Sequence, residues 1–437
     1  MPLTEEGDYV TNNEKLTALF VGIDVGSRSN YYYVMDFFGD KRLAFSAPNN
    51  QPGTKLAGER LAGCLLANNL TSIVIAMEST GFYSWHVANA LSVHERLVIY
   101  EPYVYCLNPV LIKNYKKTFT DIGKTDPLDA IAIADYARVG KIQSKPWRGA
   151  DFMPLQRLTR QRLHITENLT REKNYLLSNI FIKFSELAVG EEKPFSNSFG
   201  ATSTAVLTEF LSSEDIAESN VDDLITFIAE HGKNRFTNPG QTAKLLQKAA
   251  RDSYRLDKAL ADPINVAIAM SFDQIKFFQN QIKELDKVIA RIVKGLPSNG
   301  YTILTSIKGI GTVFASGIIA EIGDITKFDN QAALAKFAGL VWGCFDSGLF
   351  SSEDNFLTKS GNKYLRYYLI EATNSIIRHN PEYKQFYDRK CGEVNKHKHK
   401  RALALTARKF VRLVFALLRK NQLFTSKEAD RLSLTTE

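Results

Sequence analysis

Short apolar runs alternate with longer periodic segments over the first quarter of the chain. The apolar runs predict strands at 16–24, 31–38, 42–45, 72–77 and within 97–107. Apolar residues at helical spacing predict helices at 54–69 and 83–91. The order β-β-β-α-β-α-β is typical of an α/β domain, here with three strands leading.

Helical periodicity dominates the rest of the chain. A helix is predicted at 126–139, where Pro127 takes the first helical position behind Asp126 as a cap. Two long charged segments, 155–184 and 266–296, are periodic enough to form an antiparallel coiled coil. We therefore expect an α/β domain, a coiled-coil region with an inserted subdomain, and a basic, mostly α-helical C-terminal domain. Their expected bounds are 16–145, 150–298 with the insertion at 188–252, and 299–425.

The composition is that of a folded protein with a polyanionic partner. Of the 437 residues, 44% are hydrophobic and 23% are charged, which argues against wholesale disorder. The net charge of +8 favours a nucleic acid as the partner. The chain has no apolar run of membrane-spanning length, a polar N-terminus and four cysteines spaced too widely for a zinc site. These features predict a cytoplasmic protein with reduced thiols and no membrane partner.

Four carboxylates stand where predicted strands end or a helix begins. Asp24 ends the first strand, Glu78 directly follows a later one, and Asp126 and Asp129 share one face of a helix start. If the strands are parallel, their carboxyl ends meet at one edge of the sheet. Each residue alone is more often a turn residue or a cap. Together they predict a site for Mg²⁺, or alternatively Mn²⁺, which would relieve the repulsion among them.

A candidate phosphate-binding element lies in the C-terminal region. Lys359, Lys363 and Arg366 flank a turn that contains Asn362 and begin a helix, and both cations and a helix N-terminus favour anions. Ser347 precedes this element in a glycine-containing stretch and is a candidate nucleophile. A serine hydroxyl is weak without help, and the sequence near Ser347 contains no histidine that could form a triad with it.

A second glycine-containing turn lies earlier in the same region. Lys308, Gly309 and Gly311 could offer a cation and backbone N–H groups to a phosphate, as helix-hairpin-helix modules do. A tight turn between packed helices explains the two glycines equally well.

Several motifs together resemble one known family. They are Gly22-Ile23-Asp24-Val25-Gly26, Met77-Glu78-Ser79-Thr80-Gly81-Phe82-Tyr83, Lys124-Thr125-Asp126-Pro127-Leu128-Asp129-Ala130, and the stretch from Phe337-Ala338-Gly339-Leu340 through Ser347-Gly348 to Lys359-Ser360-Gly361-Asn362-Lys363-Tyr364-Leu365-Arg366. In this order they resemble the DEDD transposases of the IS110 type, which are insertion-sequence recombinases guided by a bridge RNA.

The resemblance implies a RuvC-like, ribonuclease-H-like N-terminal domain in which Asp24, Glu78, Asp126 and Asp129 bind Mg²⁺. It implies that Ser347 attacks a DNA phosphodiester and leaves a transient phosphoserine link and a 3′-hydroxyl. It also implies donor DNA, target DNA and a bridge RNA as partners. The coiled coil would mediate dimerisation, and two dimers would form a tetrameric synaptic complex.

Two other functions remain open from the residues alone. The first is a metal-dependent nuclease of the Holliday-junction type, in which Ser347 is only a turn residue. The second is a DNA- or RNA-binding protein without catalysis, in which the carboxylates are caps. A nuclease of the first kind has no need for a second DNA-facing domain of this size, so the transposase is the leading hypothesis.

Overall fold

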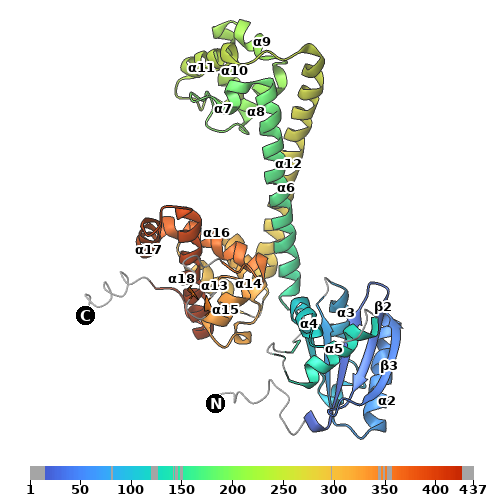
Figure 1. Ribbon diagram of the computed structural model, residues 1–437. Coiled ribbons are helices and arrows are strands. Elements are labelled where there is room, and N and C mark those ends of the chain that lie inside the picture. The colour runs from blue at the N-terminus through green and yellow to red at the C-terminus, as the bar shows by residue number, and fades with distance from the viewer. Residues whose placement is uncertain are drawn as a thin grey trace, which may run out of the picture. The chain divides into compact units, whose positions relative to one another are not determined.

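The computed structural model describes residues 15–79, 82–119, 126–140, 142, 146–147, 151–296, 298–342, 346–347, 350–351 and 357–425. The side chains of Asp126 and Ser347 lie outside the described part. The chain divides into two compact units, Met1–Asp151 and Phe152–Glu437, and each is described by itself (Figure 1).

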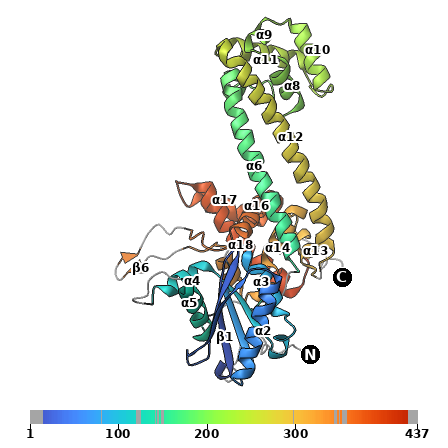
Figure 2. The ribbon, with the colours of Figure 1, turned by 90° about the vertical axis from the view of Figure 1, so that its right-hand side faces the viewer.

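The first unit is built on a five-stranded sheet in the order β3-β2-β1-β4-β5 (Figures 1 and 2). The strands are β1 (Ala18–Val25), β2 (Ser29–Met35), β3 (Lys41–Pro48), β4 (Ser72–Glu78) and β5 (Tyr103–Leu107). Neighbouring strands among β1, β2 and β3 are antiparallel, whereas β4 pairs in parallel with both β1 and β5. The predicted order of strands and helices is confirmed, but the sheet is mixed, because β2 runs opposite to the other four strands.

Helices cover both faces of this sheet. They are α2 (Gln51–Ala67), α3 (Tyr83–Ser92), the short η2 (Val98–Tyr100), α4 (Pro109–Lys116) and α5 (Asp126–Arg138). Helices α2 and α3 bury Leu61 and Val87 against one face. Helix α5 buries Ile133 and Ala134 against the other. The strands are therefore apolar on both sides, which explains why they appear in the sequence as continuous apolar runs.

Two long antiparallel helices begin the second unit. They are α6 (Met153–Lys183) and α12 (Lys258–Lys294), and they lie side by side in both views (Figures 1 and 2). At one end Leu155 packs with Ile289, and Arg162 forms an ion pair with Asp286 at 2.5 Å. The predicted pair of long helices is confirmed. Their classification as a coiled coil stays a prediction.

The segment between the long helices folds into five further helices around its own core. They are α7 (Ser185–Val189), α8 (Ala201–Glu209), α9 (Ser213–Glu218), α10 (Val221–His231) and α11 (Pro239–Asp252). Leu224, Ile228 and Leu246 pack there against Ile180 of α6. Lys183 of α6 is 3% exposed and donates hydrogen bonds to the carbonyls of Leu207 and Phe210, at the end of α8.

The C-terminal part of the second unit packs its helices around one large core. Its elements are α13 (Gly300–Thr305), α14 (Thr312–Ile322), η3 (Ile325–Lys327), α15 (Gln331–Phe337), the strands β6 (Asp346–Ser347) and β7 (Phe350–Ser351), α16 (Lys363–His379), α17 (Pro381–Gly392) and α18 (Lys398–Lys420). Tyr368 of α16 is buried and donates a 2.7 Å hydrogen bond to the Thr159 carbonyl of α6. None of the helices in the described part of the chain is long and apolar enough to cross a membrane.

Candidate active site

Asp24 and Glu78 project from the same face of the central sheet. They are the next pair after Ile23 and Met77, which are partners in the parallel β1–β4 ladder. Side chains alternate along a strand, and the residues two and four positions before Asp24 and Glu78 lie on the face covered by α5. The sheet therefore places both carboxylates under the N-terminal end of that helix.

Gly22 allows α5 to approach this face closely. A Cβ atom at Gly22 would lie 2.0 Å from the carbonyl oxygen of Ala130 and 2.5 Å from the amide nitrogen of Ala134. Helix and strand backbones are thus in direct contact two residues before Asp24. This contact brings Asp129, at the start of α5, close to the strand ends. The Asp126 backbone begins the same helix.

The pKa of Glu78 reflects the carboxylates around it. Burial raises this pKa, and the negative charges of Asp129 and Asp24 raise it further, while Lys116 partly offsets them. A carboxyl group whose pKa is raised by neighbouring negative charges favours a cation placed beside it. The described side chains nevertheless contain no group of three ligating residues close enough to hold a metal ion as they stand.

Lys116 already supplies one positive charge to this cluster. The last residue of α4, it forms an ion pair with Asp129 of α5, and both side chains are 35% exposed. Sequence reasoning missed this residue, although the run Lys113 to Lys117 places several lysines shortly before the Asp126–Asp129 helix.

The donor set fits a hard divalent cation. Asp24, Glu78 and Asp129 offer only carboxylate oxygens, which Mg²⁺ and Mn²⁺ prefer, and burial at Glu78 favours a neutralising ion. The ammonium of Lys116 is itself a cation bound to Asp129, so the cluster already attracts a positive charge. Asp126 remains a predicted ligand because its side chain lies outside the described residues.

Ser347 lies near the tip of a β-hairpin in the second unit. At the base of the hairpin, the Thr358 amide donates to the Val341 carbonyl at 2.9 Å, and Trp342 bridges Leu357. Toward the tip, β6 pairs with β7 so that Ser347 is opposite Phe350. Two residues separate these partners in the sequence.

The predicted phosphate-binding turn packs against the base of this hairpin. Gly339 and Gly361 have φ angles of +67° and +111°, and a Cβ on Gly339 would lie 2.3 Å from the Ser360 carbonyl oxygen. Arg366 donates from Nη1 to the carbonyls of Ala338 and Lys359. In this structure Arg366 therefore holds the turn together, and its contact with phosphate stays a prediction. Two more of the predicted cations, Lys359 and Lys363, are exposed.

A buried acid that the sequence analysis missed anchors the same turn. Glu321 of α14 is 4% exposed and accepts two hydrogen bonds from Arg160, at 2.7 and 2.8 Å. It also accepts from Asn362 Nδ2 at 2.7 Å. Asn362 in turn caps α16, because its Oδ1 accepts from the amides of Tyr364 and Leu365. One carboxylate thus joins the long helix α6 to the turn that follows the Ser347 hairpin.

The turn formed by Lys308, Gly309 and Gly311 joins α13 to α14. Gly309 has a φ of +99°, and its carbonyl accepts a 2.7 Å hydrogen bond from Ser375. A Cβ there would lie 2.9 Å from the His379 ring, so packing between helices accounts for this glycine. A Cβ on Gly311 would meet nothing within 4 Å. Phosphate binding at this turn stays a prediction.

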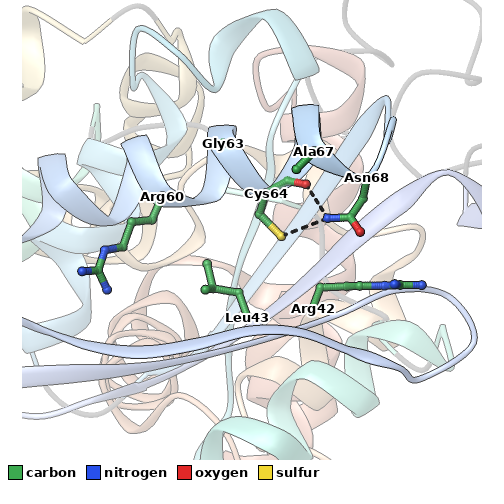
Figure 3. Close-up of a pocket in the computed structure, with 7 residues that line it drawn as sticks. All are labelled: Arg42, Leu43, Arg60, Gly63, Cys64, Ala67 and Asn68. Atoms are coloured by element: carbon green, nitrogen blue, oxygen red, sulfur yellow. Dashed lines mark hydrogen bonds between the residues drawn. The ribbon is translucent and has the colours of Figure 1, made fainter.

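An open pocket of about 360 Å³ lies on the α2 side of the sheet (Figure 3). It is lined by Arg42, Leu43, Arg60, Gly63, Cys64, Ala67 and Asn68. Arg42 is bound to Asp36, and Asn68 donates to Cys64. Because α2 and α5 cover opposite faces of the sheet, this pocket is separate from the carboxylate cluster.

Comparisons with known proteins place the chain among transposases. A family model described as transposase, of the DEDD type of IS110, matches residues 21–182. A second model, described as transposase of the IS116/IS110/IS902 family, matches residues 301–388. The first match includes all four predicted carboxylates, and the second includes the Ser347 hairpin and the turn that follows it.

Two of the individual relatives match nearly the whole chain. The insertion element IS116 protein of Streptomyces clavuligerus is 23% identical over 93% of this chain and 96% of its own length. The IS110 protein of Streptomyces coelicolor is 23% identical over 94% and 96%. The pilin gene-inverting protein of Moraxella lacunata is 27% identical over 36% of this chain and 48% of its own. The chain therefore belongs to the IS116/IS110/IS902 family of transposases, and is an enzyme of DNA transposition.

Proposed function

We propose that this transposase cuts and rejoins DNA with a metal-dependent carboxylate centre and a serine nucleophile, under the guidance of an RNA. The carboxylate centre comprises Asp24, Glu78, Asp126 and Asp129 in a RuvC-like domain. The observation that carries the proposal is the shared orientation of Asp24 and Glu78 beneath α5, where Asp129 acts on the pKa of Glu78. Caps or turn residues have no reason to converge in this way.

The four carboxylates would hold Mg²⁺ or Mn²⁺. Such an ion, when bound, polarises a phosphate and stabilises the charge that develops during its cleavage. The protein's part is to keep the carboxylates in place, and the close Gly22–Ala130 contact does so through backbone atoms.

Ser347 is the proposed nucleophile. Its Oγ would attack the scissile phosphorus, forming an Oγ–P bond while the bond from phosphorus to the 3′ oxygen breaks. The serine proton leaves to solvent, and the departing 3′ oxygen takes up a proton to become a hydroxyl. Attack by that hydroxyl on a phosphoserine would reverse the step and join strands.

The RNA and the assembly complete the proposal. Base pairing by a non-coding RNA from the element would select donor and target DNA, and two dimers of the chain would hold the two duplexes. The gene-inverting activity named for the Moraxella relative supports recombination, rather than cutting alone, as the outcome. The reaction would take place on cellular DNA in the cytoplasm.

A trapped covalent intermediate tests the serine. The substrate is a duplex from the element's own ends, nicked just upstream of the scissile phosphate, so that the short 3′-hydroxyl fragment diffuses away. Purified full-length protein, the flanking RNA and Mg²⁺ are added, and a denaturing gel separates protein–DNA adducts. Wild type should form the adduct, and omission of the RNA should abolish it.

Two variants make the test specific. Ser347→Ala should form no adduct and no recombinants, whereas Ser351→Ala, on the opposite strand of the hairpin, should retain both. Cleavage by Ser347→Ala at the wild-type rate would contradict the serine mechanism and favour a nuclease that uses only metal and water. An adduct formed equally well without RNA would contradict RNA guidance.

A further inference from the structure

The positive charge of this chain is concentrated in its last two helices. Residues Pro381–Lys420 contain twelve lysines and arginines but only three acidic residues, a net charge of +9. The whole chain carries +8. The remaining residues are therefore nearly neutral in sum, and the long-range attraction of the protein for a polyanion originates in α17 and α18.

The end of α17 and the start of α18 form one basic surface. Glu393, between the helices, accepts from Lys390 at 2.6 Å and from Arg401 at 3.3 Å, which holds the two helix ends together. A 2.6 Å hydrogen bond between Tyr387 and His399 does the same. We name this surface the basic corner, and it consists of Arg389, Lys390, Lys396, Lys398, Lys400 and Arg401.

Three lysines of the basic corner have no acidic partner within the described residues. Lys396, Lys398 and Lys400 are exposed, and their ammonium groups make no hydrogen bond or ion pair there. By contrast, Lys384 and Lys409 on the same helices are paired, with Asp388 at 3.1 Å and with Glu382 at 2.8 Å. Glu393 is the only acidic residue in the sequence from Arg389 to Arg401, and it is already shared by two cations.

Two of these lysines destabilise the helix on which they lie. Lys398 and Lys400 stand in the first turn of α18, where the helix dipole disfavours positive charge, and that turn contains no acid. Each such cation destabilises a helix by roughly 0.3–1 kcal/mol at low salt. Stability of the fold therefore does not explain them.

We propose that the basic corner is a second DNA-binding surface of this transposase, which contacts the sugar-phosphate backbone of duplex DNA outside the carboxylate centre and the Lys359–Arg366 turn. Duplex DNA carries one negative charge per ~1.7 Å and suits a group of exposed lysines that have no acidic partners. Contacts of this kind position a duplex without selecting its sequence. The inference rests on the proposed function, because it takes the recombining DNA as the occupant.

The test compares two triple variants of equal charge in the full-length protein. The first is Lys396→Gln with Lys398→Gln and Lys400→Gln. The control is Lys244→Gln with Lys276→Gln and Lys283→Gln, which removes three exposed lysines from α11 and α12. Equilibrium binding to a labelled duplex of arbitrary sequence is measured across a series of salt concentrations, together with the thermal midpoint of each protein.

The basic-corner variant should bind the duplex at least about tenfold more weakly at low salt. Its slope of log affinity against log salt should be less steep by about 2–3, because each lost phosphate contact removes ~0.9. Its thermal midpoint should stay unchanged or rise, because the substitutions remove positive charges from the N-terminal turn of a helix. The control variant should match wild type in both affinity and slope.

Three results would overturn this inference. They are a wild-type affinity and slope in the basic-corner variant, a loss shared equally by the control, and a loss confined to a stem-loop RNA with duplex DNA unaffected. Failure of the proposed function is distinguishable, because it is detected by the protein–DNA adduct and the recombinants of the Ser347 experiment, and not by the affinity for duplex DNA.

Discussion

Lys116 and Asp129 form an ion pair at the point where α4 and α5 meet beside the carboxylate cluster. The positive charge of Lys116 also lowers the pKa of Glu78, against the effects of burial and of Asp129. The ammonium group of Lys116 therefore occupies Asp129, a residue that we propose as a ligand of a divalent metal ion. An ammonium and a metal ion cannot bind the same carboxylate oxygens at once, so they compete.

Lys116→Gln should therefore tighten metal binding. Removal of the competing charge should raise the affinity for Mn²⁺, measured by calorimetry on the protein without nucleic acid, by about threefold or more. Lys113→Gln, one turn earlier on α4 and exposed, removes the same charge and should leave the affinity unchanged. Equal or weaker binding by Lys116→Gln would show that Lys116 does not compete with the metal.

Gly22→Ala should displace α5 from the sheet. The new methyl group would meet the Ala130 carbonyl at 2.0 Å, and because both atoms are tied to backbone neither can move aside cheaply. Overpacking of this kind costs about 1–3 kcal/mol, which chemical denaturation would detect, and it should also abolish recombination. Gly63→Ala is the control, since nothing lies within 4 Å of its Cβ position on exposed α2. That variant should gain about 0.5–1 kcal/mol, and equal stability of the two variants would refute the close-contact explanation.

Asn362→Asp should destabilise the second unit although aspartate is an equally good helix cap. The substitution preserves the cap of α16 but replaces a hydrogen bond to Glu321 with two carboxylates facing each other. We expect a loss of about 2 kcal/mol in the free energy of unfolding, the scale of a charged hydrogen bond. Asn330→Asp, at the exposed cap of α15, should be neutral within about 0.5 kcal/mol. Equal effects at both caps would mean that the contact with Glu321 contributes nothing.

Lys183 predicts a pH dependence of stability near the far end of the long helices. Burial lowers the pKa of its ammonium to about 8, with partial compensation by Asp215. Between this value and the higher pKa of an unfolded lysine, the unfolded chain binds more protons than the folded one. Stability should therefore rise as the pH rises from about 8 toward 10.

Urea unfolding of the wild type and of Lys183→Met at several pH values in this window checks the prediction. The contribution from Lys183 is the difference between the two pH slopes, since all other titrating groups are common to both proteins. If the free energy of unfolding changed with pH in parallel for the two proteins, Lys183 would titrate with an ordinary pKa.

The proximity of Asp24, Glu78 and Asp129 could be predicted from the sequence because each lies beside a strong local signal. Asp24 and Glu78 end apolar strands, and Asp129 follows a helix start marked by Pro127. The backbone contact at Gly22 could not be anticipated, because a glycine inside a strand does not show which helix will pack on it.

The partners of two charged residues could likewise be identified only from the tertiary structure. Glu321 is a lone acid in an apolar helix, a pattern that indicates a buried charge in need of a partner. Nothing local identifies Arg160 as that partner, since 161 residues separate the two. The Lys116–Asp129 pair likewise needed the packing of α4 on α5 to be seen.

Recombination by variants of the carboxylate centre tests the central claim most directly. The element's ends, its flanking RNA and the protein are supplied in cells, and new DNA junctions are counted by sequencing for Asp24→Asn, Glu78→Gln and Asp135→Asn. Asp135 lies on the same helix as Asp129 but is held by Tyr115 and Arg138, so it serves as the control. We expect the Asp24 and Glu78 variants to form at least about a hundredfold fewer junctions than wild type. The Asp135→Asn variant should form nearly as many as wild type. Junctions at the wild-type level from Asp24→Asn would contradict a metal-dependent carboxylate centre.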